Sequence, residues 1–233
     1  MNNSAAQTVE ERMVQIPAGA VTLEGNLTLP GEARAIVLFA HGSGSSRLSL
    51  RNRYVARLLN EANLATLLID LLTLHEEVID ARTSQLRFDI ELLAERLVDA
   101  TEWLTQSPDT KDLRIGYFGA STGAAAALQA AAVRPEAAGA IVSRGGRPDL
   151  AGMALVRVRA PALLIVGEND EQVIRLNREA LAKLHCEKQL LSLLGNIAEG
   201  DDGKASLHLH AVLGLRDGSV RGGHFCTERF GPR

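Results

Sequence analysis

Residues 113–133 read LRIGYFGASTGAAAALQAAAV, and this stretch decides the fold. Its first part, Leu113 to Phe118, is apolar enough to be a strand that other elements cover on both faces. Its last part, Thr122 to Val133, is rich in alanine and predicts a buried helix. Between them, Gly119 to Gly123 form a G-x-S-x-G turn, in which small neighbours let the backbone bend sharply. Ser121, at the centre of this turn, is the predicted nucleophile of an enzyme.

Two other interpretations of this stretch carry less weight. An ordinary glycine-lined turn needs no catalytic serine, but the buried strand and helix around Ser121 favour the nucleophile. The uncharged run from Ile115 to Val133 also holds Gly119 and Gly123 at the spacing of a membrane-helix contact. Alanine rather than leucine dominates the run, so we expect a buried strand, turn and helix instead of a membrane span.

Outward from this stretch, predicted strands and helices alternate. Apolar runs predict further strands at residues 35–40, 65–70, 138–143, 162–166 and 189–194. Apolar stripes predict helices at residues 50–62, 86–104 and 173–185. Residues 14–29 alternate and predict two or three antiparallel strands, with turns at 17–19 and 24–26. The order predicts an α/β fold with a doubly wound, mostly parallel sheet that starts with antiparallel strands.

Composition and charge narrow the classes of function. The chain has 233 residues, of which 46% are hydrophobic and 23% charged, which indicates one folded domain. The net charge of −3 predicts no basic surface for nucleic acid or an anionic membrane. Cys186 and Cys226 make neither a disulfide framework nor a zinc spacing, so we expect a cytoplasmic protein without a metal. Residues 1–12 are predicted to be a flexible N-terminus without a secretion signal.

The loop His41-Gly42-Ser43-Gly44 follows the predicted strand at 35–40. A hydrolase takes the backbone N–H donors for its oxyanion from such a loop and from the residue after the nucleophile. Ser43 and Thr122 are therefore the predicted oxyanion donors. His41 is expected to brace the loop rather than to catalyse.

Asp170 follows the strand at 162–166 and is the predicted acid that orients a catalytic histidine. A helix cap is the alternative role for its carboxylate, and one side chain can do both. The order of residues in a hydrolase then requires a histidine further along the chain. His185 lies at the end of a predicted helix, which leaves His208, His210 and His224. His224 ranks first, because it alone follows a Gly-Gly pair.

The segment from Arg144 to Asp149 follows another predicted strand, at the same sheet edge as Ser121. We interpret it as a turn with solvated arginines. Binding of an acidic group of the substrate is the alternative.

Residues 195–233 differ from the rest of the chain. They hold eight of the 21 glycines and no apolar stripe for a closing helix. This segment is therefore predicted to be poorly ordered and to leave part of the sheet uncovered.

Four segments resemble the dienelactone hydrolase-related family of bacteria, within the α/β-hydrolase fold. They are HGSGS (41–45), GYFGASTGAAAAL (116–128), SRGGRPDLAG (143–152) and LLIVGEND (163–170). The resemblance implies a hydrolase domain at 13–194, with Ser121 as nucleophile and Asp170 as acid. Dienelactone hydrolases use cysteine where this chain has Ser121, so a generic ester or lactone is the expected substrate.

The end of the chain departs from the family pattern. Members of the family carry a G-x-T-H-x-F-type loop after the last strand and then a long closing helix. Ala198 falls at the position of that histidine. A frameshift and a true divergence both explain such an ending.

The predicted function is a serine hydrolase that acts on small-molecule esters or lactones without a cofactor. A catalytically impaired hydrolase-fold protein that binds a ligand or a partner is the alternative, supported by the missing histidine. A membrane-associated protein ranks far below both.

Overall fold

The computed structural model describes the backbone of residues 10–199, 205–214 and 220–227 and the side chains of residues 11–193. Its strands are β1 (Glu10–Ala18), β2 (Val21–Leu29), β3 (Ala35–Ala40), β4 (Ala65–Ile69), β5 (Arg114–Ala120), β6 (Ala138–Arg144), β7 (Ala162–Gly167), β8 (Lys188–Glu199), β9 (Ala205–Gly214) and β10 (Val220–Thr227). Its helices are α1 (Leu50–Glu61), α2 (Leu74–Thr83), α3 (Ile90–Gln106), α4 (Thr122–Val133) and α5 (Glu171–Lys183), with 3₁₀ segments η1 (Leu86–Phe88) and η2 (Pro148–Arg157).

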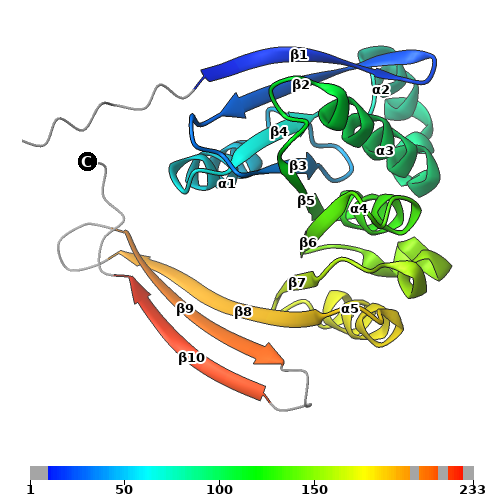
Figure 1. The fold of residues 1–233 in the computed structure, drawn as a ribbon. Helices are drawn as coiled ribbons and strands as arrows, with labels where there is room; N and C mark the ends of the chain where they lie inside the picture. Colours follow the sequence, from blue (N-terminus) through cyan, green and yellow to red (C-terminus); the bar gives the residue numbers. More distant parts are fainter. Residues whose placement is uncertain (1–9, 200–204, 215–219, 228–233) are drawn as a thin grey trace, which may run out of the picture.

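In the described part, these strands form one sheet in the order β1-β2-β4-β3-β5-β6-β7-β8-β9-β10 (Figure 1). The strands from β4 to β8 in this order run parallel. Antiparallel pairs extend the sheet at both ends. Helices α3, α4 and α5 lie on one face, and α1 lies on the other (Figure 1). The predicted doubly wound α/β fold is therefore confirmed.

The predicted turn at residues 24–26 is wrong. β2 runs straight through it, and Asn26 pairs with Met13 of β1 and Leu68 of β4. A glycine is needed at this position for another reason. A Cβ on Gly25 would lie 3.1 Å from the side chains of Leu67 and Val14. Close packing, rather than a turn, accounts for this glycine.

Helix α2 and segment η2 were not predicted, and the predicted helix at 86–104 divides at Asp89. The side chain of Asp89 accepts a hydrogen bond from Leu92 N and so starts α3. In α2, Leu74 and Val78 are mostly exposed and give no stripe against the core. A capping box between Thr73 and Glu76 stabilises its first turn instead.

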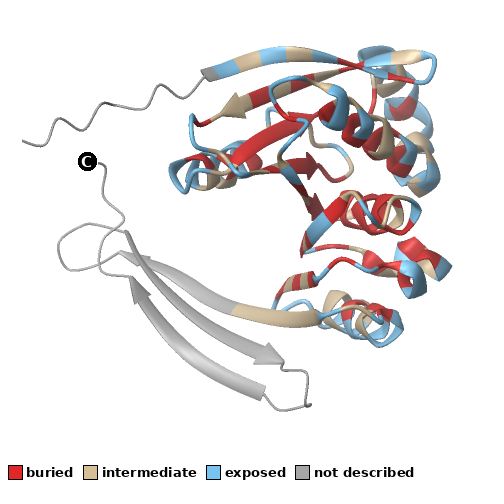
Figure 2. Cartoon of the chain, viewed as in Figure 1, coloured by how far each residue is buried: buried red, intermediate tan, exposed pale blue. Residues whose placement is uncertain are grey.

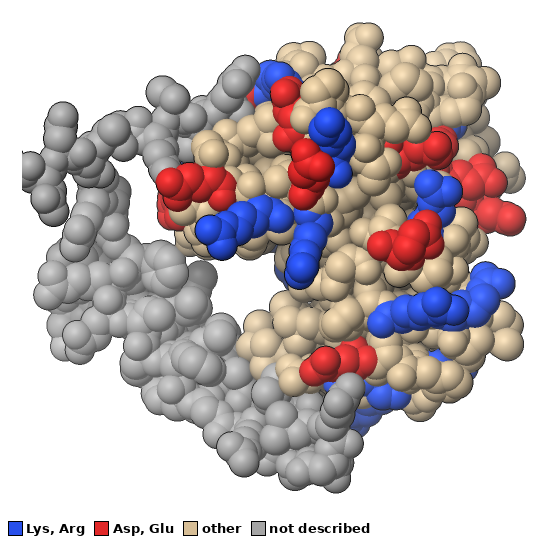
Figure 3. Space-filling view, in the orientation of Figure 1, with Lys and Arg blue, Asp and Glu red and all other residues tan. Residues whose placement is uncertain are grey.

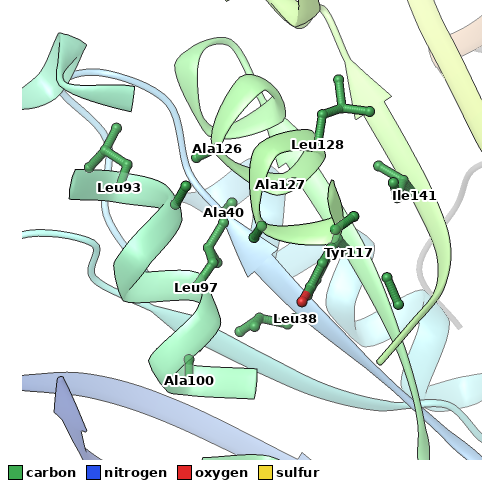
Figure 4. Packing of buried hydrophobic residues seen from close by; sticks show 14 of the residues in the cluster. Leu38, Ala40, Leu93, Leu97, Ala100, Tyr117, Ala126, Ala127, Leu128 and Ile141 are labelled. Carbon is green, nitrogen blue, oxygen red and sulfur yellow. The ribbon is translucent and has the colours of Figure 1, made fainter. Parts of the chain in front are cut away.

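Helix α4 lies at the centre of the core. Ala124 to Leu128 are fully buried, and their small side chains bring the helix close to the sheet. Figure 4 shows Ala126 and Ala127 of α4 between Leu97 of α3 and the strands. Figure 2 shows that buried residues concentrate in this helix and the parallel strands. The uncharged stretch is thus strand, turn and buried helix, and no helix of the described chain could cross a membrane.

Two glycines let α4 begin directly above the sheet. A Cβ on Gly123 would lie 2.3 Å from the carbonyl oxygen of Ala40, and one on Gly119 would lie 2.4 Å from Ala124 Cα. Both neighbours are backbone atoms and cannot rotate away. The two glycines of the G-x-S-x-G pattern are therefore required by the approach of α4 to β3 and β5.

After residue 194 the described chain forms strands instead of a closing helix. β8 continues to Glu199 and pairs with β9, which pairs with β10. At the other end, β1 begins at Glu10, before the predicted start of the domain at residue 13. Residues 1–9, 200–204, 215–219 and 228–233 lie outside the described part. The flexibility predicted for residues 1–12 and the poor order predicted for residues 195–233 stay predictions.

The contact between Gly123 and β3 gives a first test. Gly123→Ala should lower the free energy of unfolding by roughly 1–3 kcal/mol, because the added methyl meets backbone oxygens. This loss outweighs the gain of about 1 kcal/mol in helix propensity. Urea unfolding measures the effect. Gly31→Ala is the control, because no atom lies within 4 Å of its Cβ position. Equal stability of the two variants would contradict the close approach.

Candidate active site

Ser121 has a strained backbone, with φ 49° and ψ −123°. A non-glycine residue in such a conformation costs about 1–3 kcal/mol and persists only where its surroundings hold it. Its carbonyl oxygen accepts hydrogen bonds from Ala124 N at 3.1 Å and Arg147 N at 3.0 Å. On the other side, a Cβ on Gly42 would lie 2.8 Å from Ser121 Cβ. The sharp turn predicted at Ser121 is confirmed, and its side chain is half-buried.

Ser43 and Thr122 lie beside this turn. Their hydroxyl groups are 3.1 Å apart, which joins the loop after β3 to the start of α4. Neither backbone N–H donates to an acceptor among the described residues. Thr122 N is also one of the first N–H groups of a helix, which have no partner within it. Within the described part, both N–H groups are therefore without an acceptor, and both belong to residues beside the turn at Ser121.

His41 braces the loop that carries Ser43. Its Nδ1–H donates to the carbonyl of Gly42 and its Nε2 accepts from Leu71 N, both at 3.0 Å. Burial lowers the pKa of His41, and the Gly42 carbonyl and the charge of Asp70 only partly oppose this. A neutral ring with both nitrogens occupied cannot act as the base for Ser121. The expected bracing role is confirmed.

A cavity of about 350 Å³ opens beside Thr122 and the loop at 42–46. Leu71, Leu72 and Leu93 give it an apolar wall. Its charged residues are Glu77, Asp80 and Arg87, none of which was singled out from the sequence. Glu77 and Asp80 lie in α2, which was not predicted, and Arg87 lies in the adjacent η1. No apolar pattern in the sequence indicated that these residues line a site.

Asp80 and Arg87 neutralise each other within this cavity. The Asp80 carboxylate forms an ion pair with the Arg87 guanidinium and accepts from Arg87 N. Desolvation raises the pKa of Asp80, but the hydrogen bonds from Arg87 outweigh it and lower the pKa. Glu77 forms no ion pair with the described residues, so its carboxylate is the unbalanced charge of the cavity wall.

Asp170 lies between β7 and α5, at the same sheet edge as Ser121. Its Oδ1 accepts from Val173 N at 3.0 Å and caps α5, so the alternative role is observed. Its Oδ2 has no hydrogen-bond donor among the described residues, and the side chain is exposed. The cap therefore leaves one carboxylate oxygen for an imidazole. The role of Asp170 as the orienting acid stays a prediction.

The strand order separates Ser121 from the histidines of the C-terminal segment. His224 lies on β10, at the register position opposite His210 of β9. β10 is five strand positions from β5, and a spacing of about 4.8 Å gives roughly 24 Å across the sheet. His208 and His210 are four positions away. The side chains of all three lie outside the described residues.

The position expected for the family histidine is also in a strand. Ala198 pairs with Ser206 of β9, and Gly195 pairs with Leu209. The backbone therefore does not turn there into a loop above Ser121. His75 and His185, the other histidines whose side chains are described, are exposed. The structure brings Ser121, Ser43 and Thr122 together, and it does not bring His224 to them.

Comparison with known proteins gives two family matches. The model of the dienelactone hydrolase family matches residues 73–192. The model of the Plants and Prokaryotes Conserved domain matches residues 154–232. The compositional break at residue 195 therefore coincides with the end of the first match. The second match begins inside the first, and the two overlap over residues 154–192. Frameshift and true divergence both remain explanations of the ending.

Solved structures support the first match. The dienelactone hydrolase of Anabaena variabilis is 63% identical, covers 78% of this chain and 84% of its own, and has a TM-score of 0.77. A dienelactone hydrolase-like promiscuous phosphotriesterase from metagenomic libraries is 20% identical, covers 81% of this chain and 82% of its own, and has a TM-score of 0.63. The second likeness shows the fold alone.

Two curated relatives, both from Mycobacterium tuberculosis, are named "Putative phosphoribosyl transferase". Each is 54% identical over 192 residues, which are 82% of this chain and 42% of the relative. The chain thus spans less than half the length of these relatives.

The buried ring of His41 makes stability depend on pH. Its pKa in the folded state lies below the ordinary 6.5, so the unfolded chain takes up the proton first as the pH falls. Stability should therefore fall below about pH 6.5, by at most about 1.4 kcal/mol per pH unit from this group.

His41→Gln should remove this part of the pH dependence, measured by urea unfolding on both sides of that pH. His185→Gln, at an exposed histidine, is the matched control and should keep it. An unchanged slope in the His41 variant would show that the ring is not buried and neutral.

Proposed function

The chain belongs to the dienelactone hydrolase family, and on that premise we propose that it is a serine hydrolase of carboxylic esters or lactones. The observation that carries the proposal is the strained turn at Ser121 beside two N–H groups that have no acceptor among the described residues. An acyl-transfer site needs an exposed nucleophile and donors aimed at the oxyanion, and this turn supplies positions for both. The adjacent cavity of about 350 Å³ suits a small substrate.

In the proposed reaction, Ser121 Oγ attacks the carbonyl carbon of the ester or lactone. A base takes the hydroxyl proton, and the carbonyl oxygen becomes an oxyanion. Ser43 N–H and Thr122 N–H donate to it, and the positive end of α4 adds to their effect. The intermediate then collapses to an acyl-enzyme as the C–O bond to the alcohol oxygen breaks and that oxygen takes up the proton. The alcohol of an ester leaves, whereas that of a lactone stays attached to the acyl chain. Water releases the acid and restores Ser121.

The mechanism also needs a base for the proton of Ser121. Asp170 offers one free carboxylate oxygen to orient an imidazole. His224 is the histidine proposed from the sequence, but its strand lies five positions from β5. We therefore expect Ser121 to react with strongly activated reagents and to turn over ordinary esters slowly.

A second function follows from the same strand order. A hydrolase-fold protein without a base at its nucleophile would act as a binding module, with a small ester, lactone or acid as its ligand. Neither nucleic acid nor a membrane is a proposed partner. On the face seen in Figure 3, acidic and basic side chains are interspersed over the described part.

An activated fluorophosphonate separates the two functions. It should add one phosphonyl group to Ser121, and Ser121→Ala should abolish the addition without unfolding the protein. Mass spectrometry of intact protein and of peptides measures both. Labelling that persists in the alanine variant would show that another residue is the nucleophile. A wild-type protein that stays unlabelled would favour the binding module.

Asp170→Asn tests the acid. Asparagine caps helices as well as aspartate does, so stability should change little. The rate of ester hydrolysis and of fluorophosphonate labelling should fall, by up to about 10⁴ if Asp170 acts as the acid of serine proteases does. Glu168→Gln, at an exposed neighbour, is the control. Full rates in the asparagine variant would leave Asp170 as a helix cap alone.

A further inference from the structure

Asn177 lies in the second turn of α5 and is fully buried. Its Nδ2 group donates to the carbonyl oxygen of Val173, one turn earlier in the helix, at 2.8 Å. The same group donates to the carbonyl oxygen of Gly146, in the loop after β6, at 3.0 Å. One side chain thus joins α5 to a loop that lies 31 residues earlier in the sequence.

The packing of α5 alone does not explain an asparagine at this position. Asn177 Oδ1 has no donor among the described residues, and an unpaired buried oxygen lowers the stability of the fold. A leucine would fill a similar volume without burying that oxygen. In the described part, the carbonyl of Gly146 accepts a hydrogen bond from no group other than Asn177. The bond to Gly146 is therefore what the asparagine supplies and an apolar residue cannot.

The peptide group that Asn177 holds also holds the turn at Ser121. The carbonyl of Gly146 and the N–H of Arg147 belong to one planar peptide group and point in opposite directions. That N–H donates to the carbonyl oxygen of Ser121 at 3.0 Å. A Cβ on Gly146 would lie 2.6 Å from Ala124 Cβ, so this peptide group packs closely against the first turn of α4. Asn177 therefore fixes the direction of a donor that supports the strained turn.

The proposed acid, Asp170, lies at the other end of the same connection. Its Oδ1 accepts from Val173 N at 3.0 Å, and the carbonyl of Val173 accepts from Asn177. Four hydrogen bonds of 2.8–3.0 Å thus lead from Asp170 through α5 and the loop after β6 to Ser121. All four have the usual length of N–H···O hydrogen bonds in proteins.

We propose that Asn177 is a positioning residue, which fixes the turn at Ser121 and the proposed acid Asp170 relative to each other through the Gly146–Arg147 peptide group. The catalytic part of this proposal rests on the proposed function. Without Asn177, the peptide group can rotate and its N–H can leave the Ser121 carbonyl, so only Ala124 N still donates to that oxygen. A misplacement of about 1 Å in a reacting group can cost about 10²-fold in rate.

Two variants test the catalytic part. Asn177→Ala removes both hydrogen bonds of the side chain. Asn177→Ser keeps a hydroxyl that can donate to Val173 O, as serine does in helices, but its side chain is too short for Gly146. In both variants, the rate constant for fluorophosphonate labelling of Ser121 should fall at least about tenfold. Circular dichroism confirms that the labelled samples are folded.

Hydrogen exchange tests the positioning without any chemistry at Ser121. In NMR spectra, the Arg147 amide should exchange at least about tenfold faster in both Asn177 variants than in the wild type. Its rate is compared with that of the Tyr117 amide in the buried strand β5, which reports global unfolding. A general loss of stability speeds both amides, whereas release of the loop speeds Arg147 alone.

Asn60→Ala is the matched control. Asn60 is a buried asparagine of α1, and its Nδ2 also donates to a carbonyl outside its helix, that of Leu64, at 2.9 Å. The control should lose stability and keep both the labelling rate of Ser121 and the relative exchange rate of Arg147.

Each readout can fail separately. A wild-type protein that stays unlabelled would contradict the proposed function, while fast exchange of Arg147 in the Asn177 variants would still support the connection. Wild-type exchange of Arg147 in both variants, or wild-type labelling of Ser121, would overturn the proposal. An equal loss of labelling in Asn60→Ala would also overturn it, because the effect would then be one of stability.

Discussion

The approach of Gly123 to the end of β3 is the contact on which the rest of the site depends. It lets α4 begin directly above the sheet, where Thr122 N–H has no acceptor among the described residues. The short distance forces the backbone at Ser121 into a positive φ, and the loop at Gly42 packs against the serine from the other side. A larger residue at any of these points would move the nucleophile relative to its oxyanion donors.

Local rules explain which parts of this arrangement could be predicted. The buried strands and α4 are apolar on every side, so composition alone marks them, and the turn at Ser121 follows from its two glycines. Helix α2 is different, because a capping box and ion pairs stabilise it while its apolar residues face solvent. Asp80 and Arg87 were missed for the same reason. The turn predicted at residues 24–26 was wrong because a glycine that allows close packing has the same sequence signal as one that allows a turn. Gly25 is of the first kind.

The place of His224 relative to Ser121 could not be predicted, because it depends on the order of strands that are far apart in the sequence. Gly222-Gly223-His224 looks like a histidine loop locally, yet these residues lie in β10. The strand order then sets their distance from β5, and no local pattern encodes that order. The match to the dienelactone hydrolase family ends at residue 192, close to this change of structure.

A crystal structure of the protein after reaction with a fluorophosphonate tests the account most directly. We predict a phosphonyl group on Ser121 Oγ, with its free oxygen within hydrogen-bond distance of both Ser43 N and Thr122 N. The backbone at Ser121 should keep its positive φ. A phosphonyl oxygen directed away from these two N–H groups, or a group bound to another residue, would contradict the account.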